Sequence, residues 1–241
     1  MWQSPPAVLS LGYDEVHVWH AQLDVSTHDL VAYERSLSAD ERSRVQLLHH
    51  SVDQRRFIAR RGILRRLLSI YLDIKPAEIL FKYTDYGQPR LSVRDQSNAL
   101  RFTLAYASDH ALYAVSQSRD IGIDIEYLQC SFDYELIASS LFAAEEFALL
   151  SALPLAQRTR AFFRLWACKE AYIKACGLGL SLPLNTFAVA LDLDQPALLL
   201  YGHNQADALH SSLRELPINE HHVAALAVNG NDWHLRCWHY I

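Results

Sequence analysis

The sequence predicts an α+β fold, a pseudo-dimer of two similar subdomains, each with a long helix packed on a small, mainly antiparallel sheet. Two amphipathic segments of helical period, residues 53–72 and 155–176, lie in opposite halves of the chain, and each is followed by several short strand-like runs. The chain has 241 residues, of which 51% are hydrophobic, so it can bury a substantial core. We expect the subdomains to span residues 1–118 and 119–241, although no convincing sequence repeat relates them.

The first half is expected to open with a strand at residues 15–21, where polar and apolar residues alternate. Ser38, followed by Glu41 three residues later, predicts a helix start. The long helix then runs to residue 72 and ends ahead of Pro76, which cannot continue it. Strands are expected at residues 79–83, 101–106 and 111–116, with a turn at residues 86–89 after the first of them.

The second half is expected to open with a strand at residues 121–126. Helices are predicted at residues 142–150 and 155–176, and Gly177 suits the C-terminus of the second one. Further strands are predicted at four places: residues 187–191, 197–201, 222–228 and 233–238.

Composition excludes several classes of function. The net charge of −5 does not indicate the extended positive surface that binding to DNA or RNA requires. The N-terminus lacks the basic and apolar regions of a signal peptide, and no segment is uniformly apolar enough to cross a membrane, so we expect a cytoplasmic protein. The cysteines show no CxxC pairing and are expected to be reduced: Cys130, Cys168, Cys176 and Cys237. The twelve histidines show no zinc-type spacing with cysteines and are expected to be surface or core residues.

Two short segments carry the chemistry. Along the strand at residues 121–126, Asp124 and Glu126 point to one side while the intervening isoleucines point into a core. On the helix at residues 155–176, Glu170 and Lys174 lie one turn apart on one face. Each pattern alone is common on a solvated strand face or in a helix salt bridge. Together, three carboxylates and a lysine predict a Mg²⁺ site that handles phosphate, since Mg²⁺ prefers hard oxygen ligands.

These segments are recognisable. Residues 122–126 (GIDIE) and 166–174 (WACKEAYIK) resemble the two signature motifs of 4'-phosphopantetheinyl transferases of the surfactin-synthetase-activating type, in which two similar halves are fused. Residues 177–184 and 86–89 also look like that family. The resemblance implies transfer of the phosphopantetheine arm of coenzyme A to a serine of an acyl or peptidyl carrier protein, with release of adenosine 3',5'-bisphosphate.

The resemblance also implies roles for residues. Asp124, Glu126 and Glu170 would hold Mg²⁺ on the coenzyme's pyrophosphate, and Lys174 would contact the reacting phosphate. Glu170 would take the serine proton directly or orient a water that does so. The residues expected to bind coenzyme A are Arg44, Arg56, Gln88, Pro89, Tyr106, Asp124, Lys169 and Lys174. Docking of the carrier protein is expected near Gly177, Leu180 and Leu182, and we expect a monomer.

Arginine pairs recur along the first long helix. By the resemblance, Arg56 grips the coenzyme's phosphates, as does Arg44 upstream, because a guanidinium makes paired hydrogen bonds to phosphate oxygens. Four of the other arginines on this helix are expected on its solvent-exposed face: Arg60, Arg61, Arg65 and Arg66.

Two positions depart from the family pattern. Ala105-Tyr106 stands where the family usually has Ser-His, and Gln88 stands where lysine is common, so two contacts to the 3'-phosphate are altered. One alternative is therefore a catalytically impaired paralogue that still binds carrier protein or coenzyme A. A second alternative is another Mg²⁺-dependent phosphate enzyme that uses the same carboxylates on a different substrate.

Overall fold

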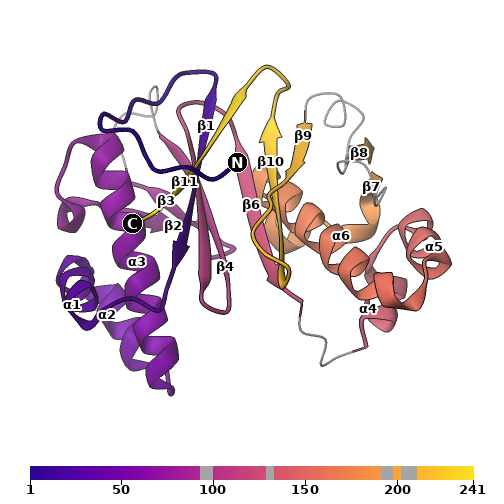
Figure 1. Cartoon of the computed structure of the whole chain (residues 1–241), viewed down its shortest axis with the longest axis horizontal. Helices are drawn as coiled ribbons and strands as arrows, with labels where there is room; N and C mark the ends of the chain where they lie inside the picture. Colours follow the sequence, from indigo (N-terminus) through magenta and orange to yellow (C-terminus); the bar gives the residue numbers. More distant parts are fainter. Residues whose placement is uncertain (93–99, 129–132, 191–197, 202–210) are drawn as a thin grey trace.

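The computed structural model describes residues 1–92, 100–128, 133–190, 198–201 and 211–241. It confirms an α+β architecture, in which two sheets lie face to face with a long helix on the outer side of each (Figure 1). The layers run α3 (Ser51–Leu72), first sheet, second sheet, α6 (Leu155–Cys176). No helix in these ranges is long and apolar enough to cross a membrane.

The first sheet has four strands in the order β11-β1-β5-β4. Its strands are β1 (Glu15–Gln22), β4 (Arg101–Ala107), β5 (His110–Ser116) and β11 (His234–His239). β4 and β5 form an antiparallel hairpin, and β5 pairs with β1 antiparallel. β11 pairs with β1 in parallel. The C-terminal strand therefore pairs with the first strand of the chain, and the division into residues 1–118 and 119–241 stays a prediction.

The second sheet has three antiparallel strands in the order β6-β10-β9. They are β6 (Ile121–Tyr127), β9 (Ser211–Glu215) and β10 (His222–Asn229). Two hairpins flank the sheets, β2 (Phe81–Tyr83) with β3 (Pro89–Leu91), and β7 (Ala188–Ala190) with β8 (Leu198–Tyr201).

Three apolar cores hold the layers together. One lies between α3 and the first sheet, one between the two sheets, and one between α6 and the second sheet. The central core takes Ile121, Ile123 and Ile125 from β6, so the predicted alternation along that strand is confirmed. The same alternation turns Gly122, Asp124 and Glu126 toward α6.

The remaining helices cover the outer sides. α1 (Thr27–Ser36) and α2 (Ala39–Gln46) pack near α3, and α4 (Tyr134–Leu141) and α5 (Ala144–Ala152) near α6. The predicted start of α2 is confirmed, because Glu41 accepts a hydrogen bond from the backbone N–H of Ser38 at 3.0 Å. Three short 3₁₀ turns complete the chain: η1 (Pro76–Glu78), η2 (Gly179–Ser181) and η3 (Leu184–Thr186).

The sequence prediction missed α1, α4 and β9. α1 and α4 are short helices of 10 and 8 residues, and segments of this length contain only two or three turns in which a helical period can be recognised. β9 reads SSLRE and lacks the β-branched and aromatic residues that favour strands. Its pairing with β10 is a tertiary effect.

Candidate active site

The carboxylates of β6 meet α6 at a point of close backbone approach. A Cβ on Gly122 would collide with the backbone of α6 at Ala171 and Ala175. Glycine at this position lets the helix lie directly on the strand. As a result Asp124 and Glu126 face the side of α6 that carries Glu170 and Lys174.

Lys174 and Asp124 form the central ion pair. Lys174 Nζ lies 2.6 Å from Asp124 Oδ1 and donates a second hydrogen bond to the Ile123 carbonyl at 3.1 Å. Asp124 is 6% exposed, and its Oδ2 is buried with no hydrogen-bond partner among the described residues. A buried carboxylate oxygen without a partner is costly in a native structure, and a cation is a natural partner for it.

The three carboxyl groups are held in an environment that disfavours their charge. Burial, together with the charge of Asp124, raises the pKa of Glu126 to about 8. Burial and the same neighbour raise the pKa of Glu170. Burial also raises the pKa of Asp124, although Lys174 opposes that shift. The single lysine therefore leaves the negative charge of this group undercompensated.

This group fits a divalent cation. All its ligand atoms would be carboxylate oxygens, which suit Mg²⁺, and Asp124 Oδ2 has no partner. A cation would stabilise the charged form of these carboxyl groups, which burial disfavours in all three and which the charge of Asp124 disfavours further in Glu126 and Glu170. The residues predicted as metal ligands, Asp124, Glu126 and Glu170, lie close enough for their charges to interact.

The carboxylates open onto a cleft of about 480 Å³ between the two halves. β4 and the turn between β2 and β3 form one wall, and β6 with the end of α6 forms the other. Five predicted coenzyme-binding residues line it: Gln88, Pro89, Tyr106, Asp124 and Lys174. Glu126 also lines the cleft, whereas Glu170 is half-buried behind it and is absent from the described lining.

Two arginines of α3 reach this cleft, contrary to the prediction that they lie on the wet face. Arg60 holds its guanidinium 3.4 Å over the ring of Tyr106. Arg61 is 6% exposed, and its Nε and Nη1 have no hydrogen-bond partner among the described residues. Burial lowers the pKa of Arg61. A guanidinium with free donors beside a cleft is a ready site for phosphate.

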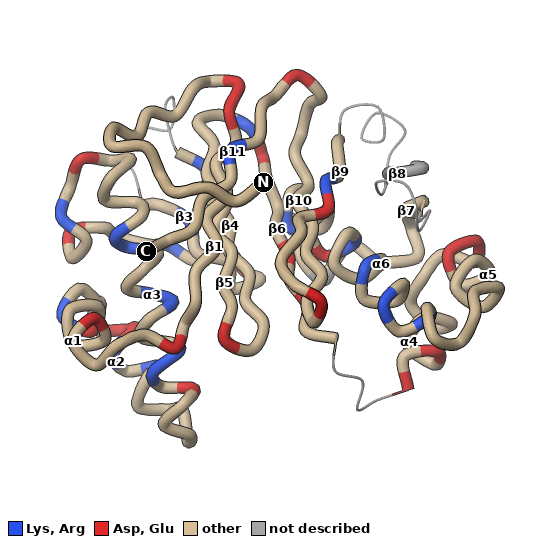
Figure 2. Tube along the Cα trace, in the orientation of Figure 1, with Lys and Arg blue, Asp and Glu red and all other residues tan. Residues whose placement is uncertain are grey.

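A sequence signal for Arg61 did exist. It lies four residues after Phe57 and three before Leu64, on the apolar stripe of α3 rather than its polar face. Arg65 follows on that stripe and is 1% exposed, with its Nε 2.8 Å from Glu41 Oε2, so its predicted surface position is also wrong. Figure 2 shows the basic residues spread along α3. The prediction overlooked Arg90 and Arg101, which also line the cleft.

The two cations predicted to grip coenzyme A lie elsewhere. Arg56 forms a two-point ion pair with Asp24, at 2.8 and 2.9 Å. Arg44 is exposed and stacks on Tyr83, with its guanidinium carbon 4.5 Å from the ring centre. Neither belongs to the described lining of the cleft.

Lys169 is not among the described residues that line the cleft, and its role in coenzyme binding stays a prediction. Lys169 is fully buried and donates to both carboxylate oxygens of Glu146 and to the Phe187 carbonyl, each at 2.7 Å. All three of its N–H groups are used. It neighbours Glu170 in sequence, but successive helix residues point about 100° apart, so Lys169 faces the core of the second half.

The predicted carrier-docking residues differ in their exposure. Leu182 is 6% exposed and packs in the core beside α6, so it offers no docking surface and that prediction is wrong. Gly177 caps α6 with φ of 70°, a left-handed conformation that favours glycine. The side chain of Leu180 lies outside the described residues. Tyr86 bonds across to Ser181 at 2.7 Å, which ties the β2–β3 turn to this segment.

One of the two departures from the family pattern, Ala105-Tyr106, is explained in part by its surroundings. Ala105 is 5% exposed and belongs to the core between the sheets, where a polar residue would not be needed. Tyr106 is 54% exposed, and its ring makes a cation–π contact with the guanidinium of Arg60. Positive charge is thus supplied to this wall by α3, and the loss of a charged side chain at residue 106 does not leave the wall neutral.

The cysteines behave as predicted where they are described. Cys168 and Cys237 are buried free thiols, and burial raises the pKa of Cys168, which makes it inert. Cys130 lies outside the described residues.

Comparison with known proteins agrees with the site. A model of the 4'-phosphopantetheinyl transferase superfamily matches residues 120–227, which contain every carboxylate of the group above. The chain is 40% identical over 239 residues to the 4'-phosphopantetheinyl transferase HetI of Nostoc sp., covering 99% of this chain and 98% of that protein. It is 31% identical over 158 residues to Sfp of Bacillus subtilis, covering 66% and 68%.

Among solved structures, the holo-[acyl-carrier-protein] synthase of Thermotoga maritima matches 46% of this chain and 62% of its own, at 20% identity and a TM-score of 0.37. That similarity is too low to bear on the architecture. The match to HetI spans both halves and both motifs, and with it the chain belongs to the 4'-phosphopantetheinyl transferase family.

Proposed function

We propose that the cleft binds coenzyme A and that the chain transfers its 4'-phosphopantetheine arm to a serine of an apo acyl or peptidyl carrier protein, releasing adenosine 3',5'-bisphosphate. The main support for the proposal is that an acidic group and a basic group lie on the same cleft. Asp124, Glu126 and Lys174 line one side of a cleft, and Arg60 and Arg61 line it as well, Arg61 with two donors that have no partner among the described residues. A polyanion with a diphosphate needs both.

Asp124, Glu126 and Glu170 would hold Mg²⁺, which supplies charge neutralisation at the diphosphate oxygens. Lys174 is anchored by Asp124 and by the Ile123 carbonyl, so its ammonium is held in place as a fixed positive charge beside the cleft. Charges fixed before the reaction need no reorganisation as negative charge develops on the leaving group.

Glu170 is the proposed proton acceptor for the carrier serine, directly or through a water. It is half-buried, and burial and the charge of Asp124 raise its pKa, which brings the carboxylate closer to the basicity that a proton acceptor needs near neutral pH.

Arg61 and Arg60 are the proposed phosphate contacts on the opposite wall. Arg61 offers Nε and Nη1, which are free of partners among the described residues, and Arg60 is oriented by Tyr106. Gln88 and Pro89 close the end of the cleft at the β2–β3 turn. This set replaces Arg56, Arg44 and Lys169 in the coenzyme site.

We propose further that the chain acts in the cytoplasm as a monomer and that the carrier docks beside Gly177. Leu178, which is 38% exposed, is an apolar side chain on that segment that a partner can reach. The first half would then serve mainly the coenzyme and the second half the cation and the carrier.

The test is a transfer assay followed by mass spectrometry. With coenzyme A, Mg²⁺ and an apo carrier protein, the carrier should gain the mass of one phosphopantetheine arm. Glu170→Gln should abolish the gain, while Glu220→Gln, a matched change at an exposed site, should leave it intact. Failure of the wild-type chain to modify any of several carriers would refute the proposal and favour an impaired paralogue.

A further inference from the structure

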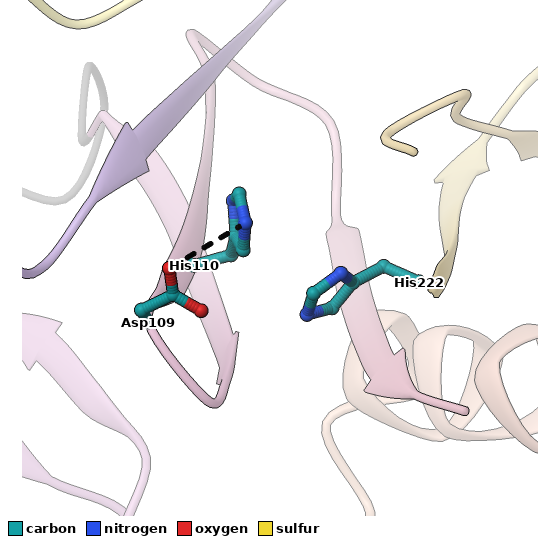
Figure 3. Close-up of side chains that lie close together, drawn as sticks. All are labelled: Asp109, His110 and His222. Carbon is teal, nitrogen blue, oxygen red and sulfur yellow. Dashed lines mark ion pairs between the residues drawn. The ribbon is translucent and has the colours of Figure 1, made fainter. Parts of the chain in front are cut away.

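Asp109, His110 and His222, which we name the seam cluster, lie together at the edge of the gap between the two sheets (Figure 3). Asp109 and His110 come from the β4–β5 hairpin of the first sheet, and His222 begins β10 of the second. One ligand atom from each lies within 4.8 Å of the other two. The cluster is separate from the carboxylates above, because Asp124 and Glu126 face α6.

The tautomer of His222 is fixed by its surroundings. The backbone N–H of His221 donates to Asn219 Oδ1 at 2.9 Å, which identifies that atom as the amide oxygen. His222 Nδ1 lies 2.9 Å from the same oxygen and must therefore carry the hydrogen. Its Nε2 is left with a lone pair, and this atom is buried without a hydrogen-bond partner among the described residues.

That state is the one a metal-binding histidine adopts. Such a ligand usually donates its other ring N–H to a carbonyl or carboxylate oxygen, which orients the ring. Asn219 supplies this contact. His222 is 4% exposed, and a neutral imidazole with this arrangement is the form that coordinates a metal.

His110 is arranged in a similar way. It is 7% exposed, and its Nδ1 lies 2.7 Å from His20 Nε2, which can accept a hydrogen bond from it. The other nitrogen, Nε2, lies 3.8 Å from Asp109 Oδ2. That separation is too long for a hydrogen bond. Two ligands of one tetrahedral zinc ion, each about 2.0–2.1 Å from it, lie about 3.3 Å apart, so a small contraction would suffice.

We propose that the seam cluster is a second metal site, for Zn²⁺ or a related divalent transition metal, that links the first sheet to the second. Two neutral imidazoles and one carboxylate form a donor set typical of zinc, whereas Mg²⁺ prefers oxygen ligands alone. Three protein ligands leave a coordination position for water. The spacing of the histidines in the sequence does not indicate this group, because its members come from distant strands and include no cysteine.

The test uses the full chain, stripped with a chelator and then kept in excess Mg²⁺ to occupy the carboxylate site. Titration with Zn²⁺ by calorimetry should show one equivalent bound per chain. His222→Gln and Asp109→Asn should each weaken the Kd for Zn²⁺ by more than tenfold, and Asn219→Ala by about 10- to 100-fold. His221→Gln, an exposed neighbour, should bind Zn²⁺ like the wild type.

Two outcomes would overturn the proposal. One is wild-type protein that binds no Zn²⁺ once Mg²⁺ is in excess, which would assign any binding to the carboxylates. The other is Asp109→Asn and His222→Gln proteins that bind as tightly as the wild type. Asp109 lies on a hairpin with a side chain 34% exposed, so its variant keeps the test decisive if the buried histidine variant does not fold.

Discussion

Replacement of Arg61 by methionine should weaken coenzyme A binding without unfolding the chain. Methionine keeps an unbranched apolar stem on the buried stripe of α3 and removes the guanidinium. In the free protein, Nε and Nη1 of Arg61 have no hydrogen-bond partner among the described residues, so the replacement loses one long hydrogen bond, from Nη2 to the Tyr83 hydroxyl at 3.4 Å. Glu41, which lies 3.7 Å from Arg61 Nε, keeps its closer ion pair with Arg65 at 2.8 Å.

The magnitude follows from the contacts that the phosphate would lose. A hydrogen bond to a charged group contributes about 1.5–3 kcal/mol. Loss of one such bond raises the Kd for coenzyme A by about 10- to 150-fold, since about 1.4 kcal/mol corresponds to a factor of ten. The free energy of unfolding should change by less than this, because removing a desolvated charge offsets part of the lost packing.

Calorimetric titration of coenzyme A into each variant, with urea unfolding alongside, measures both quantities. Arg56→Met is the matched control, because Arg56 lies on the same helix but pairs with Asp24 away from the described lining of the cleft. Its Kd should stay within about twofold of the wild type, since it makes no contact with the ligand. The reasoning is refuted if Arg61→Met binds coenzyme A as tightly as the wild type, or if Arg56→Met loses as much.

Three further predictions follow from the same contacts. Gly122→Ala would push a Cβ into the backbone of α6, so it should cost about 1–3 kcal/mol in urea unfolding and weaken Mg²⁺ binding; unchanged values of both would show that α6 shifts freely. Lys169→Met leaves Glu146 charged and buried, so it should cost about 3–5 kcal/mol, and a Lys169→Met, Glu146→Leu double variant should recover most of that and bind coenzyme A normally. Folding raises the pKa of Glu126 from 4.5 to about 8, so the metal-free protein should lose stability as pH rises across that window, whereas Mg²⁺ affinity should rise; titrations at both ends that show no trend would contradict this.

Local periodicity was enough for the long elements. The segment 155–176 has a helical pattern along its whole length, and α6 begins and ends at those residues. The strict alternation of β6 assigned the faces of Asp124 and Glu126, because side chains on a strand alternate with a period of two. The family motifs then placed Glu170 and Lys174 beside them, which the packing of α6 on β6 explains.

The same reasoning failed where a side chain's partner lies far along the chain. Lys169 and Glu170 are adjacent in sequence, yet Lys169 forms a buried ion pair with Glu146, whereas Glu170 lies with Asp124 and Glu126. The motif contained both residues but not the direction of each. Arg61 was misplaced for a related reason, since arginine is usually exposed and only its position on an apolar stripe indicated otherwise.

The sequence by itself thus determined the long helices and which residues of β6 face α6, because both depend on patterns within a few residues. Its short motifs also indicated the family to which the chain belongs. Tertiary structure alone decided that β11 pairs in parallel with β1, that the arginines of α3 line the cleft, and that His222 meets His110. Each of these joins segments tens to hundreds of residues apart. These segments are brought together by the burial of apolar side chains in the three cores, and no local sequence pattern indicates which segments share a core.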